Sequence, residues 1–286
     1  MKVSGFTIVR NAVKYDYPVV EAITSVLPLC DEFVVAVGNC EDNTLALIQG
    51  IHSDKIRIIH SVWDDSLREG GRTLAVETDK AFQAVASDSD WAFYIQADEI
   101  VHERFYDTIR QAMDKYRNDL KVEGLLFRYK HFYGSYDYVG ESWSWYRREI
   151  RIIRNNKRIF SYRDAQGFRK KPNNKLNVKL IDAFIYHYGW VRDPRAMQQK
   201  QRTFGSYYHD DHWLENNIAK AEEFDYSNID SLELFKETHP AVLSHRIEQK
   251  NWKFDYDVTK KNYSFKERIK RLFGYRIGEY KNYKIV

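Results

Sequence analysis

Cysteine is scarce in this chain, which has only Cys30 and Cys40 among 286 residues. The two do not form a CxxC pair, and two cysteines are too few for a disulfide framework at this length. No run of about 18 apolar residues occurs, so no membrane-spanning helix is predicted. The first residues also lack the charged and apolar regions of a secretory signal peptide. Together these absences favour reduced thiols and a cytoplasmic protein.

A large net charge is absent as well. The 45 Lys and Arg residues nearly balance the 41 Asp and Glu residues and leave a net charge of +4, which argues against general nucleic-acid binding. We find no internal repeat and no low-complexity tract. Hydrophobic residues make up 43% of the chain, enough for one large globular domain or two small ones.

Short apolar runs alternate with helical patterns over the first hundred residues. The expected strands cover residues 5–9, 32–38, 55–59 and 91–95. The expected helices between them cover residues 17–27, 42–51 and 70–86. Strands separated by helices of this length indicate βαβ units, and hence an α/β fold whose mostly parallel sheet is flanked by helices.

The pattern changes after residue 103. A helix is expected over 105–116, followed by strands over 123–131, 148–154 and 180–188. These strands lack regular intervening helices, which predicts a mixed edge of the sheet. Helices are then expected over 194–213 and 218–224, and a polar, aromatic segment begins at residue 226.

Two adjacent acids, Asp98 and Glu99, follow the apolar run at residues 91–95. In open α/β sheets, ligands bind outside the carboxyl ends of the strands. Carboxylates at that position can hold Mg²⁺ or Mn²⁺ together with the phosphates of a substrate. The alternative is that the pair begins the next helix, where acids favour the positive end of the helix dipole.

Three segments occur in a recognisable order: Thr7 to Asn11, Gly38 to Thr44, and Gln96 to Glu99, each after an expected strand. This order resembles the nucleotide-sugar domain of GT-A glycosyltransferases, most closely glycosyltransferase family 2. The resemblance covers residues 4–105 well and residues 125–195 loosely. It departs from the usual pattern where Gln96 stands in place of an acid and Gly38-Asn39 in place of paired acids.

The resemblance implies an inverting transferase that moves a sugar from a UDP- or GDP-sugar to a glycan or lipid-linked acceptor. It also implies a catalytic domain over residues 1–193, in which 1–105 bind the donor and 106–193 the acceptor. Residues 194–286 then form a helical and aromatic C-terminal extension. We assign contacts to the donor to Val9, Arg10, Asn11, Asn39, Asp42, Arg72 and Ala97.

The resemblance further implies a metal on the donor diphosphate, held by Asp98 and Glu99. His187, in the run Ile185 to Trp190, resembles the histidine that closes such sites and ligates the metal in some relatives. An imidazole suits Mn²⁺ better than Mg²⁺, and either ion is expected. Alternatively, His187 ends a strand and packs among its aromatic neighbours.

An inverting transferase needs a carboxylate that takes the proton of the acceptor hydroxyl. Asp164 is the first candidate, because relatives place an acid in the loop before the histidine strand. Glu141 is the second, since its loop is aromatic and could stack on a sugar. Glu149 is flanked by arginines and is expected to be ion-paired. A solvated loop acid is the alternative for Asp164 and Glu141.

Two other functions stay open. A nucleotidyltransferase shares a similar sheet and also holds a metal-bound nucleotide, although the segment after the first strand lacks that class's glycine-rich loop. An inactive protein that only binds a nucleotide-sugar is the other alternative.

A basic amphipathic helix is expected over residues 265–273. It predicts contact with an anionic membrane surface or a partner, and the first of these would associate the cytoplasmic protein with a membrane. The alternative is a tail packed on the catalytic domain.

Overall fold

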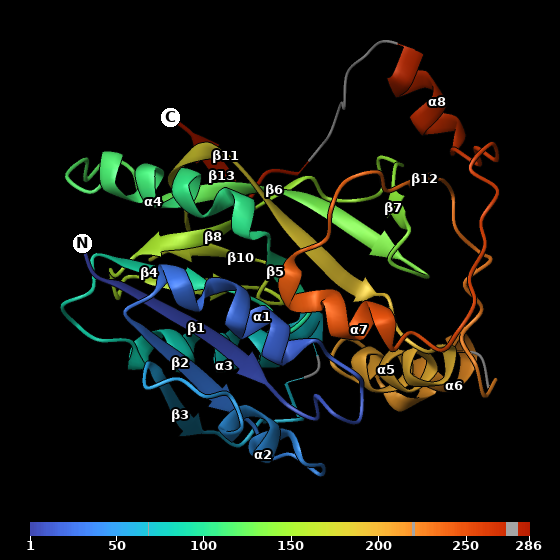
Figure 1. Cartoon of the computed structure of the whole chain (residues 1–286), viewed down its shortest axis with the longest axis horizontal. Helices are drawn as coiled ribbons and strands as arrows, with labels where there is room; N and C mark the ends of the chain where they lie inside the picture. Colours follow the sequence, from blue (N-terminus) through green and yellow to red (C-terminus); the bar gives the residue numbers. More distant parts are fainter. Residues whose placement is uncertain (68, 219–220, 273–279) are drawn as a thin grey trace.

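The computed structural model describes residues 1–67, 69–218, 221–272 and 280–286. In this part of the chain, a central sheet runs through the molecule in the order β3-β2-β1-β4-β8-β6-β11 (Figure 1). Its strands are β1 (Val3–Val9), β2 (Glu32–Val37), β3 (Ile56–His60), β4 (Trp91–Tyr94), β6 (Gly124–Tyr133), β8 (Arg148–Arg154) and β11 (Asn174–Trp190). Strand β8 is antiparallel to both of its neighbours, whereas the other neighbouring pairs are parallel.

Helices cover both faces of this sheet. They are α1 (Val19–Val26), α2 (Thr44–Gln49), α3 (Arg72–Ala84) and α4 (Tyr106–Lys115). Strand β1 is buried along its whole length because alternate side chains enter two different cores. Val9 packs in the core with residues of α1, α2 and α4, and Phe6 packs in the core with residues of α3. The α/β class with a mostly parallel sheet between helices is therefore confirmed.

Shorter strands pair with β6, with β11 or with one another. They are β5 (Glu99–Val101), β7 (Tyr138–Gly140), β9 (Ile159–Tyr162), β10 (Gly167–Lys170), β12 (Leu232–Leu234) and β13 (Tyr283–Ile285). Short 3-10 turns occupy Leu27–Leu29, Glu69–Gly71, Glu103–Phe105 and Ala241–Leu243. Strand β5 is antiparallel to β11, and Glu99 pairs with His187 in that register. This pairing brings the acidic end of β4 beside the histidine strand.

The C-terminal part contains α5 (Pro194–Ser206), α6 (Asp211–Asn217), α7 (Ser244–Glu248) and α8 (Phe265–Leu272). The single helix expected over 194–213 is in fact two, because Asp210 caps a new helix and accepts a hydrogen bond from the Trp213 N–H at 2.8 Å. None of the helices in the described ranges is long and apolar enough to cross a membrane.

The prediction of a helix over 218–224 is wrong for those of its residues that the structure describes. Ile218 is extended, and residues 221–224 are not helical. The Phe224 N–H donates instead to the Pro194 carbonyl at 2.9 Å, and the Phe224 ring packs near Trp190 and Tyr226. Packing of the aromatic ring against α5 and β11 thus overrides the helical pattern. Phe273, the end of the expected basic helix, lies outside the described residues.

Candidate active site

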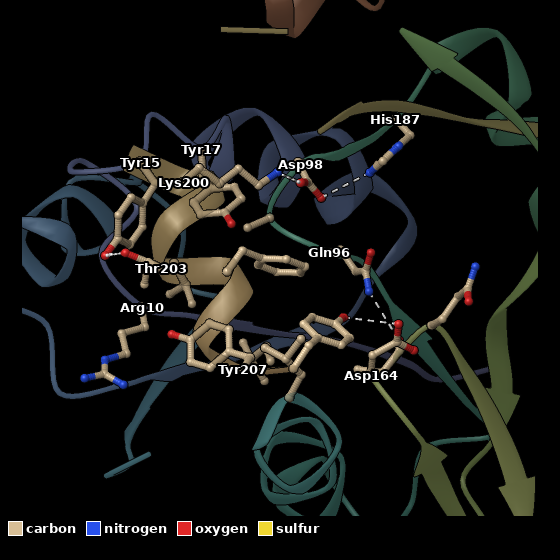
Figure 2. A pocket seen from close by; sticks show the side chains of 18 of the residues that line it. Arg10, Tyr15, Tyr17, Gln96, Asp98, Asp164, His187, Lys200, Thr203 and Tyr207 are labelled. Carbon is tan, nitrogen blue, oxygen red and sulfur yellow. Dashed lines mark hydrogen bonds and ion pairs between the residues drawn. The ribbon is translucent and has the colours of Figure 1, made fainter. Parts of the chain in front are cut away.

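A cavity of about 310 Å³ lies at the carboxyl ends of β1 and β4 and is closed on one side by α5 (Figure 2). Its wall combines the ends of β1, β4 and β11, the loop at 164–166 and the helix α5. Of the residues assigned from the sequence, it brings together Val9, Arg10, Ala97, Asp98, Asp164 and His187. The others do not line it.

Asp98 occupies the wall between His187 and Lys200 (Figure 2). Its carboxylate lies 3.7 Å from His187 Nε2 and 3.3 Å from Lys200 Nζ. Burial by itself would raise the pKa of Asp98, but the charge of Lys200 and smaller contributions from other neighbours outweigh it and lower the pKa. Asp98 is therefore an ionised carboxylate that faces the cavity.

Glu99 is turned away from the cavity, although it is the next residue. It is completely buried, and Arg151 binds both of its oxygens with two hydrogen bonds of 2.7 Å each. The Tyr129 hydroxyl at 2.7 Å and the Gln96 N–H at 3.1 Å donate to the same carboxylate. A carboxylate whose oxygens are taken by four donors is not available to a metal, so the assignment of Glu99 as a ligand is not supported.

Two histidines form a hydrogen-bonded chain behind Asp98. His131 Nε2 lies 2.7 Å from the Tyr146 carbonyl, and His131 Nδ1 lies 2.9 Å from His187 Nδ1. Burial lowers the pKa of both histidines, so each is neutral near pH 7. A carbonyl can only accept, so His131 carries its proton on Nε2 and accepts at Nδ1 from His187. His187 Nε2 is then an unprotonated nitrogen beside Asp98.

Asp164 lies on the opposite side of the cavity, in a tightly shaped loop. Its neighbours Arg163 and Ala165 have φ values of 58° and 61°, in the left-handed region that such residues rarely adopt. The Tyr208 hydroxyl donates to Asp164 at 3.2 Å. A Cβ atom on Gly71 would lie 2.6 Å from the Asp164 Cβ, so Asp164 can occupy this position only against a glycine.

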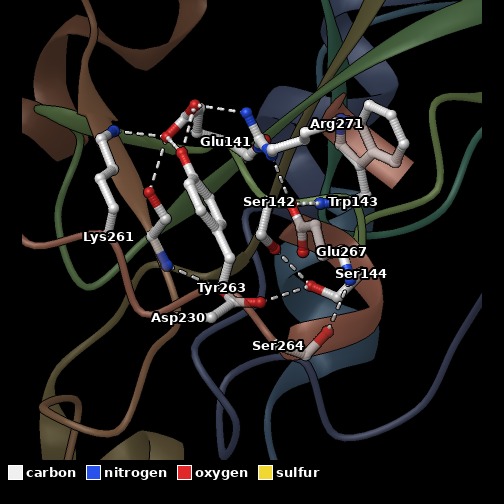
Figure 3. A network of polar contacts seen from close by, with 11 residues as sticks. Glu141, Ser142, Trp143, Ser144, Asp230, Lys261, Tyr263, Ser264, Glu267 and Arg271 are labelled. Carbon is white, nitrogen blue, oxygen red and sulfur yellow. Dashed lines mark hydrogen bonds and ion pairs between the residues drawn. The ribbon is translucent and has the colours of Figure 1, made fainter. Parts of the chain in front are cut away.

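Glu141 lies outside the cavity, in a polar cluster under α8 (Figure 3). Its carboxylate accepts hydrogen bonds from Lys261, from Ser231 at 2.6 Å, from Tyr263 at 2.7 Å and from Arg271 at 3.1 Å. Burial would raise the pKa of Glu141, but the hydrogen bonds from Lys261, Ser231 and Tyr263 outweigh it and lower the pKa to about 2. A carboxylate this acidic and this fully bonded is a poor base, so its assignment as the reserve base is not supported.

The residues that the sequence assigns to contacts with the nucleotide-sugar donor divide into two groups. Val9, Arg10 and Ala97 line the cavity, and Arg10 is ion-paired with Asp65 at 2.6 Å. The others build the loops beside it or lie on the surface. Asn11 accepts from the Glu41 N–H, Asn39 from the Trp63 N–H and Asp42 from the Lys14 N–H, whereas the Arg72 side chain is exposed. These four do not face the cavity.

Sequence reasoning missed the contribution of α5. Lys200, Thr203 and Phe204 of this helix line the cavity, as do Tyr15 and Tyr17 after β1. Lys200 is 9% exposed, and its ammonium also donates to the Gly189 carbonyl at 2.8 Å. A lysine in a polar helix carries no signal of this contact, because its partner Asp98 lies 102 positions earlier in the chain.

The side chains of the cavity wall can be compared with the ligands that a divalent metal ion prefers. Asp98 supplies a carboxylate and His187 an unprotonated nitrogen, 3.7 Å apart, on the wall of one cavity. In the described residues no group of three or more metal-binding side chains occurs. Two protein ligands nevertheless suit an ion that takes its remaining ligands from a diphosphate and water, as Mg²⁺ does at many phosphate sites. Asp98 and His187 therefore fit a metal that binds together with a nucleotide.

No protein-family model matches this chain, and no curated protein matches it by sequence. Solved structures do resemble it. TarS 1–349 of S. aureus matches with a TM-score of 0.41 and 15% identity, over 78% of this chain and 67% of that one. The chain covers 39% of the longer TarS structure.

Two further structures show a weaker likeness. Glucosyl-3-phosphoglycerate synthase from Mycobacterium tuberculosis, solved with Mn²⁺, UDP and phosphoglyceric acid, matches with a TM-score of 0.29 and 17% identity, over 46% of this chain and 43% of that one. The 4-diphosphocytidyl-2C-methyl-D-erythritol synthase of Anaerococcus prevotii matches with a TM-score of 0.34 and 11% identity, over 54% and 71%. At such TM-scores the likenesses assign neither a substrate nor a residue's role. The topology itself agrees with the GT-A type of fold that the sequence resemblance implies.

Proposed function

We propose that this protein is an inverting glycosyltransferase that moves a sugar, expected to be a hexose, from a nucleotide-diphosphate sugar to a hydroxyl of a glycan or a lipid-linked acceptor. One observation carries the proposal: Asp98, His187 and Asp164 line one cavity at the carboxyl end of β4. This combination provides a cation site for a diphosphate and a separate carboxylate for an acceptor.

The cavity walls suit a nucleotide-sugar. Tyr15, Trp63 and Tyr207 offer aromatic faces for a base or a sugar ring. The UDP and GDP series are the donors to test first, because the sequence resemblance implies one of these two.

In the proposed reaction, Asp98 and His187 would hold a Mn²⁺ or Mg²⁺ ion on the donor diphosphate, and such an ion would supply positive charge to the leaving nucleoside diphosphate. Asp164 takes the proton from the acceptor hydroxyl while that oxygen attacks the anomeric carbon. The bond from that carbon to the diphosphate breaks on the opposite side, so the configuration inverts. Gly71 and Tyr208 hold the Asp164 carboxylate in position.

The experiment is a screen of UDP- and GDP-sugars with Mn²⁺, with and without sugar or polyprenyl-phosphate-sugar acceptors. Release of nucleoside diphosphate that an acceptor accelerates is the expected result. Release of pyrophosphate from a nucleoside triphosphate and a sugar phosphate would identify a nucleotidyltransferase instead. Nucleotide-sugar binding without turnover of any acceptor or of water would leave a binding protein.

We also propose that α8 brings the protein to an anionic membrane surface. Glu267 and Arg271 face the body: Glu267 accepts from the Trp143 N–H at 2.9 Å, and Arg271 donates to Glu141 (Figure 3). Phe265, Ile269 and Leu272 lie on the other side and are 78%, 43% and 82% exposed. The sequence adds Lys266, Arg268 and Lys270 between these apolar residues. An exposed apolar stripe with basic neighbours is typical of a helix that lies in a membrane interface.

Sedimentation with phosphatidylglycerol liposomes tests this contact. We expect binding at low salt that weakens as salt rises, and that is lost when Phe265 and Leu272 are both changed to Ser. Leu120→Ser is the matched control, because Leu120 is 83% exposed but lies far from α8 in the sequence. Equal sedimentation of all three proteins would contradict a role for α8.

A further inference from the structure

Lys200 is a buried amine for which the proposed chemistry has no role so far. Burial and the charge of Arg192 lower its pKa to about 7 against the opposing charge of Asp98, so it is a cation below that pH. Its ammonium donates to the Gly189 carbonyl at 2.8 Å and lies 3.3 Å from Asp98 Oδ2 (Figure 2). The same nitrogen lies 5.0 Å from the centre of the Tyr17 ring. Lys200 therefore contacts the one carboxylate that the donor's metal would need.

A second buried cation stands behind the first. Arg192 is fully buried, and its guanidinium lies 4.8 Å from the same Tyr17 ring. It donates to the Tyr15 carbonyl at 2.6 Å, but its Nε and Nη2 atoms have no hydrogen-bond partner among the described residues. Since Glu99 is neutralised by Arg151, the positive groups among the described residues that act on the Asp98 carboxylate are the Lys200 amine and the Arg192 guanidinium.

This charge balance decides which ligand can approach. A free divalent ion at Asp98 would meet the positive charge of Lys200 in a site where little water screens it. A diphosphate brings the negative charge that Lys200 and Arg192 lack, and it offers oxygens to the same ammonium. The lysine has a flexible four-carbon stem and already lines the cavity, so its ammonium can move from Asp98 to a phosphate without a movement of α5.

We propose that Lys200 occupies the cation position at Asp98 in the free protein and moves to the diphosphate when the donor arrives, so that the metal binds with the nucleotide and not before it. This inference rests on the proposed function, since it takes a nucleoside diphosphate as the ligand of the cavity. Lys200 is then a binding residue for the donor, and its charge is the reason that the metal binds only together with the nucleotide.

Binding of Mn²⁺ measured by electron paramagnetic resonance, without turnover, tests the proposal. In the absence of nucleotide and at pH 6, where the Lys200 amine is protonated, Lys200→Met should bind Mn²⁺ at least about tenfold more tightly than the wild type, because a repelling charge is gone. In the wild type, UDP or GDP should raise Mn²⁺ affinity about a hundredfold, and Mn²⁺ should raise nucleotide affinity by the same factor. In Lys200→Met this coupling should fall to about tenfold or less.

Three variants make the result decisive. Lys200→Arg keeps the charge and should exclude free Mn²⁺ as the wild type does. Asp98→Asn should bind no Mn²⁺ in either state, and the exposed Lys253→Met should behave as the wild type. Lys200→Gln, which can still donate to the Gly189 carbonyl, replaces Lys200→Met if the latter does not fold.

Free Mn²⁺ that binds the wild type as tightly as it binds the uncharged variants would overturn the proposal. So would a coupling factor that the variants leave unchanged. A wild-type protein that binds neither nucleoside diphosphate would instead contradict the proposed function, while the nucleotide-free Mn²⁺ comparison would still decide whether Lys200 occupies the cation position.

Discussion

Two clusters of side chains in this molecule both combine carboxylates with lysine and tyrosine, but they differ in how much hydrogen-bonding capacity they leave on the carboxylates. Around Glu141, Lys261, Tyr263 and Arg271 saturate the carboxylate, and the cluster ties α8 to the body (Figure 3). Around the cavity, Asp98 and Asp164 each keep capacity for a ligand (Figure 2). Among the described residues, side-chain hydrogen bonds reach Asp98 from Lys200 and Asp164 from Tyr208. A carboxylate with spare acceptor capacity in a cavity can do chemistry, whereas a saturated one holds the structure together.

The largest expected effect is on turnover. Asp164→Asn should lower turnover by about two to four orders of magnitude, because the amide cannot take the proton of the acceptor. Affinity for the donor should barely change. Steady-state rates with a natural or surrogate acceptor, together with donor titration, provide the measurement.

Glu141→Gln is the control for that prediction, since it lies in the saturated cluster. We expect its turnover to stay within about threefold of the wild type. A reversal, in which Glu141→Gln loses turnover and Asp164→Asn keeps it, would show that the comparison of the two clusters assigns the base to the wrong residue.

A smaller loss is expected from the glycine behind Asp164. Gly71→Ala places a Cβ atom 2.6 Å from the Asp164 Cβ and should displace the carboxylate, which lowers turnover by about ten- to a hundredfold. Gly70→Ala is a matched control: its φ is also positive, at 58°, but no atom lies within 4 Å of the added Cβ. Both substitutions place an alanine at a positive φ and carry the same kind of backbone strain. Equal turnover in the two would therefore contradict a positioning role for Gly71.

The smallest expected effect concerns stability. Glu149 is buried and faces neither cluster, and burial raises its pKa to about 8 against the opposing charge of Arg151. The opposing charge is that of Arg151 and not of the arginines that flank Glu149 in the sequence, so the expectation that these flanking arginines keep Glu149 ionised is not supported. The unfolded chain ionises this carboxyl first, near pH 4.5, so its contribution to stability falls as pH rises from 4.5 towards 8.

Glu149→Gln removes that dependence. We expect the variant to gain on the order of 2 kcal/mol in unfolding free energy over the wild type at pH 8 and little at pH 4.5. Urea unfolding at the two pH values provides the measurement. A gain of the same size at both would show that the titration of Glu149 is not its source.

The first hundred residues were the most predictable part of the fold. Their strands are apolar runs of ordinary length separated by helical patterns, and such local signals survive in the folded chain. The position of Asp98 followed from the same rule, because a ligand site lies beyond the carboxyl end of a buried strand. The predictions were less accurate where contacts between segments far apart in the sequence determine the structure. The segment at 221–224, which lies along α5, is an example.

The candidate site was less predictable for three physical reasons. Glu99 begins β5, and successive side chains of a strand point to opposite faces. Asp98 therefore faces the cavity, whereas the next side chain, Glu99, points away from it to the buried Arg151. Lys200 reaches Asp98 through the placement of α5, which no local pattern encodes. Glu141 and Asp164 are both loop acids in aromatic surroundings, and only the hydrogen-bond partners that each finds in the fold distinguish them.

The central claim is that the cavity at the end of β4 binds the diphosphate of a nucleotide donor through Asp98. Isothermal titration of UDP and GDP in the presence of Mn²⁺, with the wild type and with Asp98→Asn, tests it most directly. We predict that the wild type binds one of the two nucleotides at one site, and that Asp98→Asn, although folded, loses the Mn²⁺-dependent part of the affinity. Unchanged Mn²⁺-dependent binding in Asp98→Asn, or no binding to the wild type, would contradict the claim.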